Sequence, residues 1–120
     1  MVEYTLEDGA PMEVATLTAT FAALGDPVRQ RMVELLADGD RTVSELAARF
    51  PISVQAVSKH IKVLEHAGVV SRGRAAQTRP VHLEAASLAG TADWLEAHRR
   101  RLETRYERLD ALLDERKATT

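Results

Sequence analysis

The chain has 120 residues, of which 45% are hydrophobic and 28% charged, and it contains no cysteine. This composition is typical of one globular domain, and it excludes disulfides, thiolate metal ligands and cysteine nucleophiles. No apolar run reaches the ~18 residues of a membrane span, and the N-terminus lacks the basic and apolar regions of a signal peptide, so we expect a cytoplasmic protein.

The formal net charge of −2 is unevenly distributed along the chain. Residues 1–25 contain four acidic and no basic residues, whereas residues 26–80 contain nine basic and six acidic ones. Residues 81–120 return to a slight acidic excess, with seven basic and eight acidic residues. A nucleic-acid surface is therefore expected in the middle of the chain.

Residues 1–11 show no periodicity and predict a flexible N-terminal arm before a single domain over residues 12–116. From Met12 to Leu24, apolar residues recur at helical spacing and predict a helix that ends at Gly25. Asp26-Pro27 is a strong signal for the start of a second helix, since Asp is a favoured N-cap and Pro suits the first position. Its apolar side consists of Val28, Met32, Leu35 and Leu36.

Thr42 and Glu45 form a capping-box pattern at the start of a third, short helix. Its apolar residues are Val43, Leu46, Ala47 and Phe50, and Pro51 is expected to end it. A brief link leads to a fourth helix, which Ser53 caps and which His66-Ala67-Gly68 closes. Two short helices joined in this way predict a helix-turn-helix.

The fourth helix has two different sides at helical periodicity. Val54, Val57, Ile61 and Leu64 share one side, and Gln55, Ser58, Lys59 and Lys62 share the other. Such a polar face fits the major groove of DNA. An ordinary amphipathic helix with a solvated face would give the same pattern, and the neighbouring elements favour the DNA interpretation.

Two β-prone runs follow, Val69–Arg74 and Arg79–Leu83, and they predict a hairpin with a polar turn. Pro80 has no N–H for the ladder, so its nitrogen should face away from the partner strand or lie at a bulge. Arg72, Arg74, Gln77 and Arg79 cluster near the tip, where a charged loop is usually only solvated. Beside a helix-turn-helix, however, these arginines are suited to contacts with the DNA backbone or minor groove.

The last segment, about Ala85 to Glu115, predicts a long helix with a short tail at residues 117–120. Its apolar residues alternate in steps of four and three, a heptad pattern broken only by Arg99. The run Arg99–Arg101 is interpreted as a solvated face, because glutamates lie three or four residues away. A helix this long needs a second surface, so we predict a homodimer through the first and last helices. Its interface residues are Val14, Leu17, Phe21, Leu88, Leu95, Leu102, Tyr106 and Leu109.

The predicted fold is therefore mainly α with a small β-hairpin, a winged helix-turn-helix. Across residues 14–113 the sequence resembles the ArsR/SmtB family of bacterial dimeric regulators. The resemblance is carried by the segments Leu24–Arg29, Ser44–Ala47 and Ser58–Val70. It implies a repressor that binds double-stranded DNA at a palindromic operator through the fourth helix and the hairpin.

The family's metal-sensing members carry a Cys-x-Cys pair that aligns with Thr42 and Ser44, and neither residue is a thiol here. The last helix offers Asp93 and His98 without a second histidine at the matching interval. The remaining histidines, His60, His66 and His82, show no i, i+4 pair and form no ligand set. We therefore expect a branch without metal sites, with no metal or cofactor and with a small-molecule inducer left open.

The predicted roles follow from position on the fourth helix. Gln55 could pair bidentately with adenine, while Lys59 and Lys62 neutralise phosphates. For His60, the helical angle favours a half-buried residue and the resemblance favours a DNA contact. The full predicted DNA-binding set is Thr42, Ser53, Gln55, Ala56, Ser58, Lys59, His60, Lys62, Arg72, Arg74, Gln77 and Arg79.

Three other functions compete with this interpretation. An enzyme is not supported, because the sequence has no phosphate-binding glycine loop and no Ser/His/Asp spacing. A protein-interaction module that uses the C-terminal helix is an alternative, although the basic hairpin argues against it. A MarR-like winged-helix regulator is the other alternative, but those proteins usually have longer chains.

Overall fold

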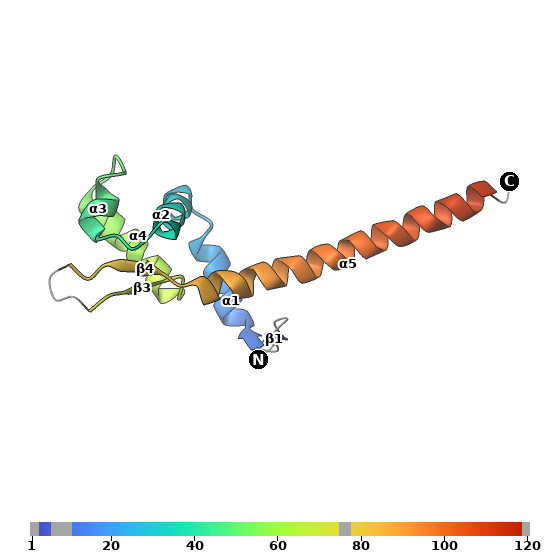
Figure 1. The fold of residues 1–120 in the computed structure, drawn as a ribbon, viewed down its shortest axis with the longest axis horizontal. Coiled ribbons are helices and arrows are strands. Elements are labelled where there is room, and N and C mark those ends of the chain that lie inside the picture. Colours follow the sequence, from blue (N-terminus) through green and yellow to red (C-terminus); the bar gives the residue numbers. More distant parts are fainter. Residues whose placement is uncertain (1–2, 6–10, 75–77, 119–120) are drawn as a thin grey trace.

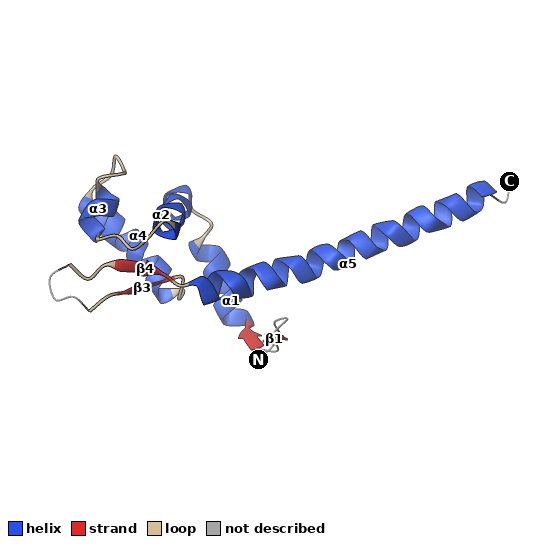
Figure 2. Ribbon diagram, viewed as in Figure 1, coloured by secondary structure: helices blue, strands red, loops and turns tan. Residues whose placement is uncertain are grey.

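The computed structural model describes residues 3–5, 11–74 and 78–118. Figures 1 and 2 show a compact winged head from which one long helix extends. In chain order the elements are β1 (Glu3–Thr5), β2 (Pro11–Glu13), α1 (Val14–Ala23), α2 (Pro27–Ala37), α3 (Val43–Ala47), α4 (Val54–His66), β3 (Val70–Arg72), β4 (Val81–Leu83) and α5 (Ala85–Ala118). The predicted winged helix-turn-helix is confirmed.

The capping residues that the sequence indicated hold the starts of three helices. The Asp26 carboxylate accepts the backbone N–H groups of Val28 at 2.9 Å and Arg29 at 3.1 Å. Thr42 and Glu45 form the complete capping box of α3. The Ser53 hydroxyl accepts the N–H of Ala56 at 3.1 Å at the start of α4. These caps pair backbone donors that would otherwise lack partners.

α3 is shorter than the sequence predicted. It ends at Ala47, whereas we expected it to continue to Phe50. The N–H of Arg49 bonds to the carbonyl of Leu46 and the N–H of Phe50 to that of Ala47, so the chain tightens into i→i+3 turns. This is the expected response to Pro51, because a residue before proline is disfavoured in the α conformation.

The hydrophobic core lies where α2, α3, α4 and the two β3/β4 strands meet. Met32, Leu46, Val57, Leu64 and Val81 are completely buried there. α4 contributes its apolar side, while its opposite side stays outside the core. The core therefore determines how α4 is rotated about its own axis.

The end of α4 and the wing are joined by a Schellman motif. Gly68 has a φ of 78°, and its N–H bonds to the carbonyl of Glu65 while the N–H of Val69 bonds to that of Leu64. Glycine suits this left-handed position because it has no Cβ. The turn directs the chain into β3, so α4 and the wing have a fixed relation.

We define the wing as β3, β4 and the turn between them. The strands are antiparallel, with Val70 opposite Leu83 and Arg72 opposite Val81, and Arg41 forms an isolated bridge to Val81. The Gly73 N–H donates to the Pro80 carbonyl at 2.7 Å, and a Cβ on Gly73 would lie 2.8 Å from the Pro80 ring. Pro80 thus lies just before β4 and contributes only its carbonyl.

The N-terminal segment has more regular structure than its sequence indicated. Residues 1–11 were expected to form a flexible arm, and in the described part of this segment β1 pairs with β2 in an antiparallel hairpin. Residues 1–2 and 6–10 lie outside the described residues. α1 then begins at Val14 rather than Met12, because Pro11 to Glu13 belong to β2.

α5 gives the molecule its elongated shape, with principal extents of 74 × 32 × 23 Å. Its 34 residues span about 51 Å at the rise of an α-helix. The radius of gyration is 20.0 Å, against about 14 Å for a compact chain of this length. α1 packs on the first part of α5, where Phe21 meets Trp94 edge to face with ring centroids 5.5 Å apart.

We expect Leu64→Ala to lower the free energy of unfolding by about 2–5 kcal/mol, because Leu64 is fully buried and its truncation leaves a cavity. Val63→Ala is the matched control, since Val63 is the adjacent residue on α4 and is exposed. Urea denaturation measures both variants. Equal losses of stability would contradict the assignment of the core-facing side of α4.

Candidate DNA-binding surface

The polar face of α4 is exposed and carries donors that the protein does not use. Gln55, Lys59 and Lys62 are exposed, and Ser58 is half-buried. Among the described residues, none of the three exposed side chains makes an ion pair or hydrogen bond. Val57, Ile61 and Leu64 are buried on the opposite side, as the sequence predicted. The arrangement leaves one amide and two ammonium groups available to a ligand.

The position of Val54 differs from the one that the sequence predicted. It was assigned to the buried side of α4, yet 53% of its surface is exposed. Val54 is the first residue of the helix, and its angular position puts it at the edge of the apolar stripe, where the core does not reach. Ile52 is also exposed in the preceding turn. These apolar side chains therefore lie at the same end of α4 as Gln55.

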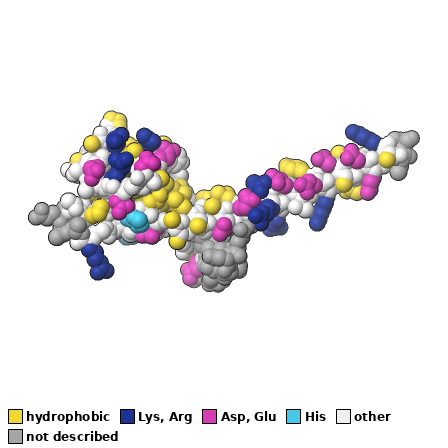
Figure 3. Space-filling model, viewed as in Figure 1, with side chains coloured by type: hydrophobic (Ala, Val, Ile, Leu, Met, Phe, Trp, Pro, Cys, Tyr) yellow, Lys and Arg dark blue, Asp and Glu magenta, His cyan; other side chains and the backbone are white. Residues whose placement is uncertain are grey.

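Arg49 was not among the predicted site residues. It lies in the turn between α3 and α4, is exposed, and makes no ion pair among the described residues. The signal that could have identified it was its position between the two helices of the helix-turn-helix. Figure 3 shows Lys and Arg side chains interspersed with Asp and Glu on this face of the head, and further Lys and Arg side chains along the long helix.

His60 lies between the polar and apolar sides of α4. Its side chain is 22% exposed, and its Nδ1 lies 3.1 Å from Nη1 of Arg29 and 3.9 Å from the Asp26 carboxylate. The half-buried position expected from the helical angle is confirmed. A DNA contact by this residue stays a prediction.

Thr42 and Ser53 are the N-caps of α3 and α4, and Ala56 is half-buried in the first turn of α4. The pKa of Glu45 is lowered, first by the backbone N–H of Thr42 and then by the Thr42 side chain. Both helix starts are held in place by their caps. Backbone N–H groups at helix N-termini are suited to binding phosphate.

The wing arginines differ in their exposure and in their hydrogen bonds within the protein. Arg72 is half-buried, and its Nε donates to the carbonyl of Arg79 at 2.9 Å. This bond spans the base of the wing turn, where Arg79 has a φ of 31°. Arg74 and Arg79 are exposed. The prediction for Gln77 falls on a residue outside the described ranges.

Asp40 and His82 link the wing to the loop after α2. Nδ1 of His82 lies 2.8 Å from the Asp40 carboxylate, and about half of each side chain is exposed. The hydrogen bond to Asp40 raises the pKa of His82, and the charge of Asp40 raises it further. The pair is a structural contact of the wing rather than part of the polar face of α4.

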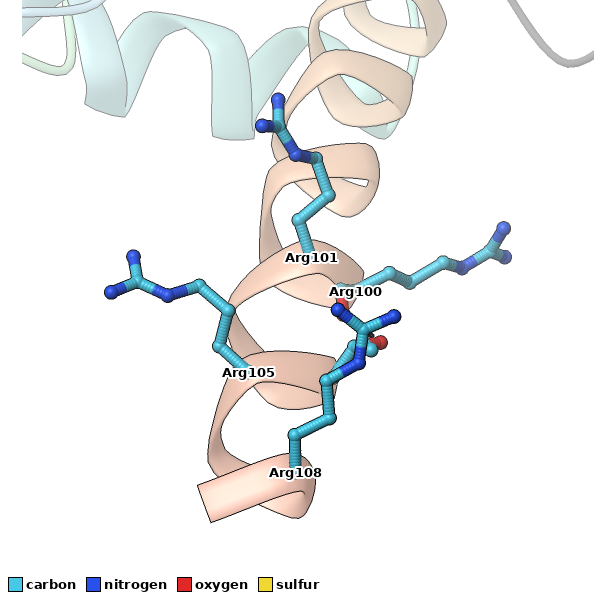
Figure 4. Close-up of a pocket in the computed structure, with 5 residues that line it drawn as sticks. Arg100, Arg101, Arg105 and Arg108 are labelled. Carbon is cyan, nitrogen blue, oxygen red and sulfur yellow. Dashed lines mark hydrogen bonds between the residues drawn. The ribbon is translucent and has the colours of Figure 1, made fainter.

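The arginines of α5 fall into two groups. Arg99 pairs with Glu96 and Glu103, and Arg100 also bonds to Glu96. These bonds, from Arg99 first, lower the pKa of Glu96 to about 2. Arg101 has no ion-pair partner in the described part of the chain, so the predicted pairing is confirmed for only two of the three. Figure 4 shows Arg100, Arg101, Arg105 and Arg108 pointing away from the helix in different directions.

The predicted dimer residues are divided between the core and the surface. Leu17 is only 4% exposed and has little surface left for a second copy, while Leu88 is half-buried and packs against the core. Val14 is half-buried, and Phe21 is partly covered by Trp94. About half of the surface of four predicted residues is exposed, in a row along α5: Leu95, Leu102, Tyr106 and Leu109.

The residues aligned with the metal-sensing cysteines serve other purposes. Thr42 caps α3, and Ser44 is exposed in its first turn. Nδ1 of His98 lies 2.9 Å from the backbone carbonyl of Trp94, and the two rings are stacked. Within the described ranges, no three His, Asp or Glu side chains are grouped as a metal site.

Comparisons with known proteins agree with this geometry. Residues 24–72, which contain α2, α3, α4 and β3, match a helix-turn-helix domain family. The chain is 33% identical to the transcriptional repressor SdpR of Bacillus subtilis over 62% of its length and 83% of that protein. It is 39% identical to the HTH-type regulator Rv2034 of Mycobacterium tuberculosis over 72% of its length and 81% of that protein.

A comparison with a solved structure shows to which family the chain belongs. The ArsR-like transcriptional regulator from Rhodococcus sp. RHA1 superposes with a TM-score of 0.72 at 31% identity, over 82% of this chain and 92% of that one. The chain belongs to the ArsR family. It is a DNA-binding transcriptional regulator, and such proteins are not enzymes. No helix among the residues that the structure describes is long and apolar enough to cross a membrane.

The raised pKa of His82 predicts a pH-dependent stability of the ArsR-family protein. A raised folded-state pKa stabilises the fold below the unfolded-state pKa, and this contribution is lost as pH rises through the folded-state pKa. Asp40→Asn should therefore lower the urea midpoint more at about pH 5.5 than at about pH 8.5. Asp38→Asn, which removes a neighbouring exposed carboxylate, should show no such difference. A pH-independent effect of Asp40→Asn would contradict the contribution of the ion pair.

Proposed function

We propose that the protein is a homodimeric transcriptional repressor that binds a palindromic operator, with α4 in the major groove of each half-site. The observation that carries the proposal is the exposed polar face of α4, where Gln55, Lys59 and Lys62 lie opposite the buried apolar side. Among the described residues, these three side chains have no hydrogen-bond or ion-pair partner. A helix that is fixed by its core and offers unpaired donors outward has the form required for base recognition.

Sequence readout is assigned to the N-terminal end of α4. Gln55 is suited to a bidentate hydrogen bond with adenine, and exposed Val54 to an apolar contact with a thymine methyl group. Lys59 and Lys62 follow further along the helix and are suited to phosphates, together with Arg49 in the preceding turn. The two ends of the helix would therefore have different roles.

The wing is assigned to the DNA backbone. Arg74 and Arg79 are exposed beside the turn, whereas Arg72 braces the wing through its bond to the Arg79 carbonyl. Arginine in such a position contributes affinity without reading a base.

Dimerisation is assigned to α5, with α1 alongside. The exposed apolar residues of α5 recur at heptad spacing over more than three turns, and isolated helices rarely expose such a row to water. A solution structure from Mycobacterium bovis, 20% identical with a TM-score of 0.60, is described as a homodimeric winged helix-turn-helix DNA-binding domain. The match between the two structures covers 76% of this chain and 85% of the Mycobacterium bovis chain.

We infer repression, because a dimer bound at an operator that overlaps a promoter would exclude polymerase. The relative SdpR is named as a transcriptional repressor, which supports the same assignment. The experiment that tests the proposal is selection of bound fragments from genomic DNA, followed by footprinting. A selected set without a repeated half-site would contradict it.

We expect the two parts of the α4 face to respond differently to truncation. Lys59→Ala or Lys62→Ala should weaken binding to all sequences and reduce the salt slope by about one unit for each phosphate that is no longer neutralised. Gln55→Ala should cost about 1–3 kcal/mol on the preferred sequence and leave nonspecific binding unchanged. Titrations at several salt concentrations, on operator and on random DNA, separate these effects. Identical responses of the lysine and glutamine variants would refute the division of roles.

We expect Leu102→Glu to weaken dimerisation roughly tenfold or more, because it places a charge in the apolar row of α5. Ala111→Glu is the matched control, since Ala111 is exposed on the opposite side of the same helix. Sedimentation equilibrium measures association, and footprinting should show protection of one half-site where the parent protects two, about 10–10.5 bp apart. Association unaffected by Leu102→Glu would remove α5 from the interface.

A further inference from the structure

The side chain of Arg29 connects the end of α1 to α4, the proposed DNA-recognition helix. Arg29 lies in the first turn of α2, and its Nε donates to the carbonyl of Ala23 at 2.6 Å. Its Nη2 lies 3.4 Å from the carbonyl of Ala22, so both bonds reach the last turn of α1. Its Nη1 lies 3.1 Å from Nδ1 of His60, near the middle of α4. A single guanidinium group thus contacts two helices besides its own.

The contact determines which nitrogen of His60 carries the proton. An arginine side chain has only donors, so Nδ1 of His60 must accept. In a neutral imidazole the proton then lies on Nε2. Nε2 has no hydrogen-bond partner among the described residues and is not closed off from solvent. The ring therefore has a free Nε2–H donor.

The nearby carboxylate of Asp26 is the competing partner of Nδ1. It lies 3.9 Å from Nδ1, beyond hydrogen-bond distance, and it already accepts the backbone N–H groups of Val28 and Arg29. If Nδ1 carried a proton toward Asp26, the ring N–H would face an Arg29 N–H at 3.1 Å. The geometry favours the Arg29 contact and the Nε2–H form.

We propose that Arg29 is a positioning residue for DNA recognition, because it fixes His60 in the Nε2–H tautomer and the ring then donates to a DNA phosphate. The proposal rests on the proposed function, since it requires the α4 face to lie against DNA. His60 lies about 100° around α4 from Lys59, at the boundary of the polar face, so we assign its ring to a phosphate at the edge of that face. Arg29 itself is half-buried and acts through His60.

The tautomer can be measured without DNA. Long-range ¹H–¹⁵N correlation spectra of histidine-labelled protein should show His60 as a single Nε2–H tautomer in the wild type. Arg29→Gln should give a mixture of tautomers. Arg31→Gln removes the same charge from the exposed face of α2, and Gln30→Ala removes a bond to Leu24 at the same corner. Both controls should leave the spectrum unchanged, and a wild-type Nδ1–H tautomer would overturn the proposal.

Binding measurements test the phosphate contact. Arg29→Gln and His60→Ala should each weaken operator binding about tenfold, and the double variant should be no weaker than either one. His60→Gln should retain most of the affinity, because its amide can accept from Arg29 and donate outward. Arg31→Gln controls for the loss of charge. An effect of Arg29→Gln no larger than that of Arg31→Gln, or additive losses in the double variant, would overturn the proposal.

The two proposals fail in different ways. A wild-type protein that binds no DNA would overturn the proposed function, and with it the phosphate contact of His60. The tautomer spectrum would then decide alone whether Arg29 fixes the ring. A folded Arg29→Gln variant that binds DNA weakly and keeps the Nε2–H tautomer would overturn the positioning role and leave the proposed function intact.

Discussion

The burial of one side of α4 is the constraint on which the DNA-binding surface depends. Val57, Ile61 and Leu64 are at most 1% exposed, and each contributes about 1.5–3 kcal/mol by its burial. A rotation of α4 by one residue, about 100°, would expose part of this stripe and bury lysine or glutamine. The orientation of the polar face is therefore set by apolar contacts with α2, α3 and the wing. No direct interaction between the polar residues is required.

The sequence predicted most of this arrangement because its signals are local. Asp26, Thr42 and Ser53 cap helices through bonds to residues two or three positions away, and such patterns can be read from the chain alone. Gly68 likewise ends α4 at a position that needs a positive φ. The start of each element from α2 to α4, and hence the frame of the head, follows from these residues.

The parts that the sequence did not predict depend on contacts between distant segments. Val54 fits the apolar stripe by angle, but the core ends before the first turn of α4, and only the packing shows this. By spacing alone Leu17 is as available for a partner as Leu102, yet it is buried within its own chain. Arg29 and His60 are separated by 31 positions, and no periodicity indicates that they meet.

The charged residues that flank the apolar row of α5 indicate the function of that helix face. Its apolar row is flanked on one side by Glu96, Glu103 and Asp110 and on the other by Arg101 and Arg105. Arg99 lies within the row, but its charge is balanced by Glu96 and Glu103 of the same helix. A nucleic-acid patch would instead be predominantly basic. The acidic edge, the apolar row and the basic edge together resemble the flanks of a helix-pairing surface.

The recognition helix is thus held by two kinds of contact with different requirements. The apolar stripe fixes its rotation and tolerates small shifts, because dispersion and burial are not directional. The bonds from Arg29 to His60 and to the end of α1 are directional and weaken steeply with distance and angle. α1 also contacts α5 through Phe21 and Trp94. Because Ala23 in the last turn of α1 is also buried in the core, a displacement of that turn would affect both kinds of contact. The polar contact at His60 is the more sensitive of the two, because it is directional.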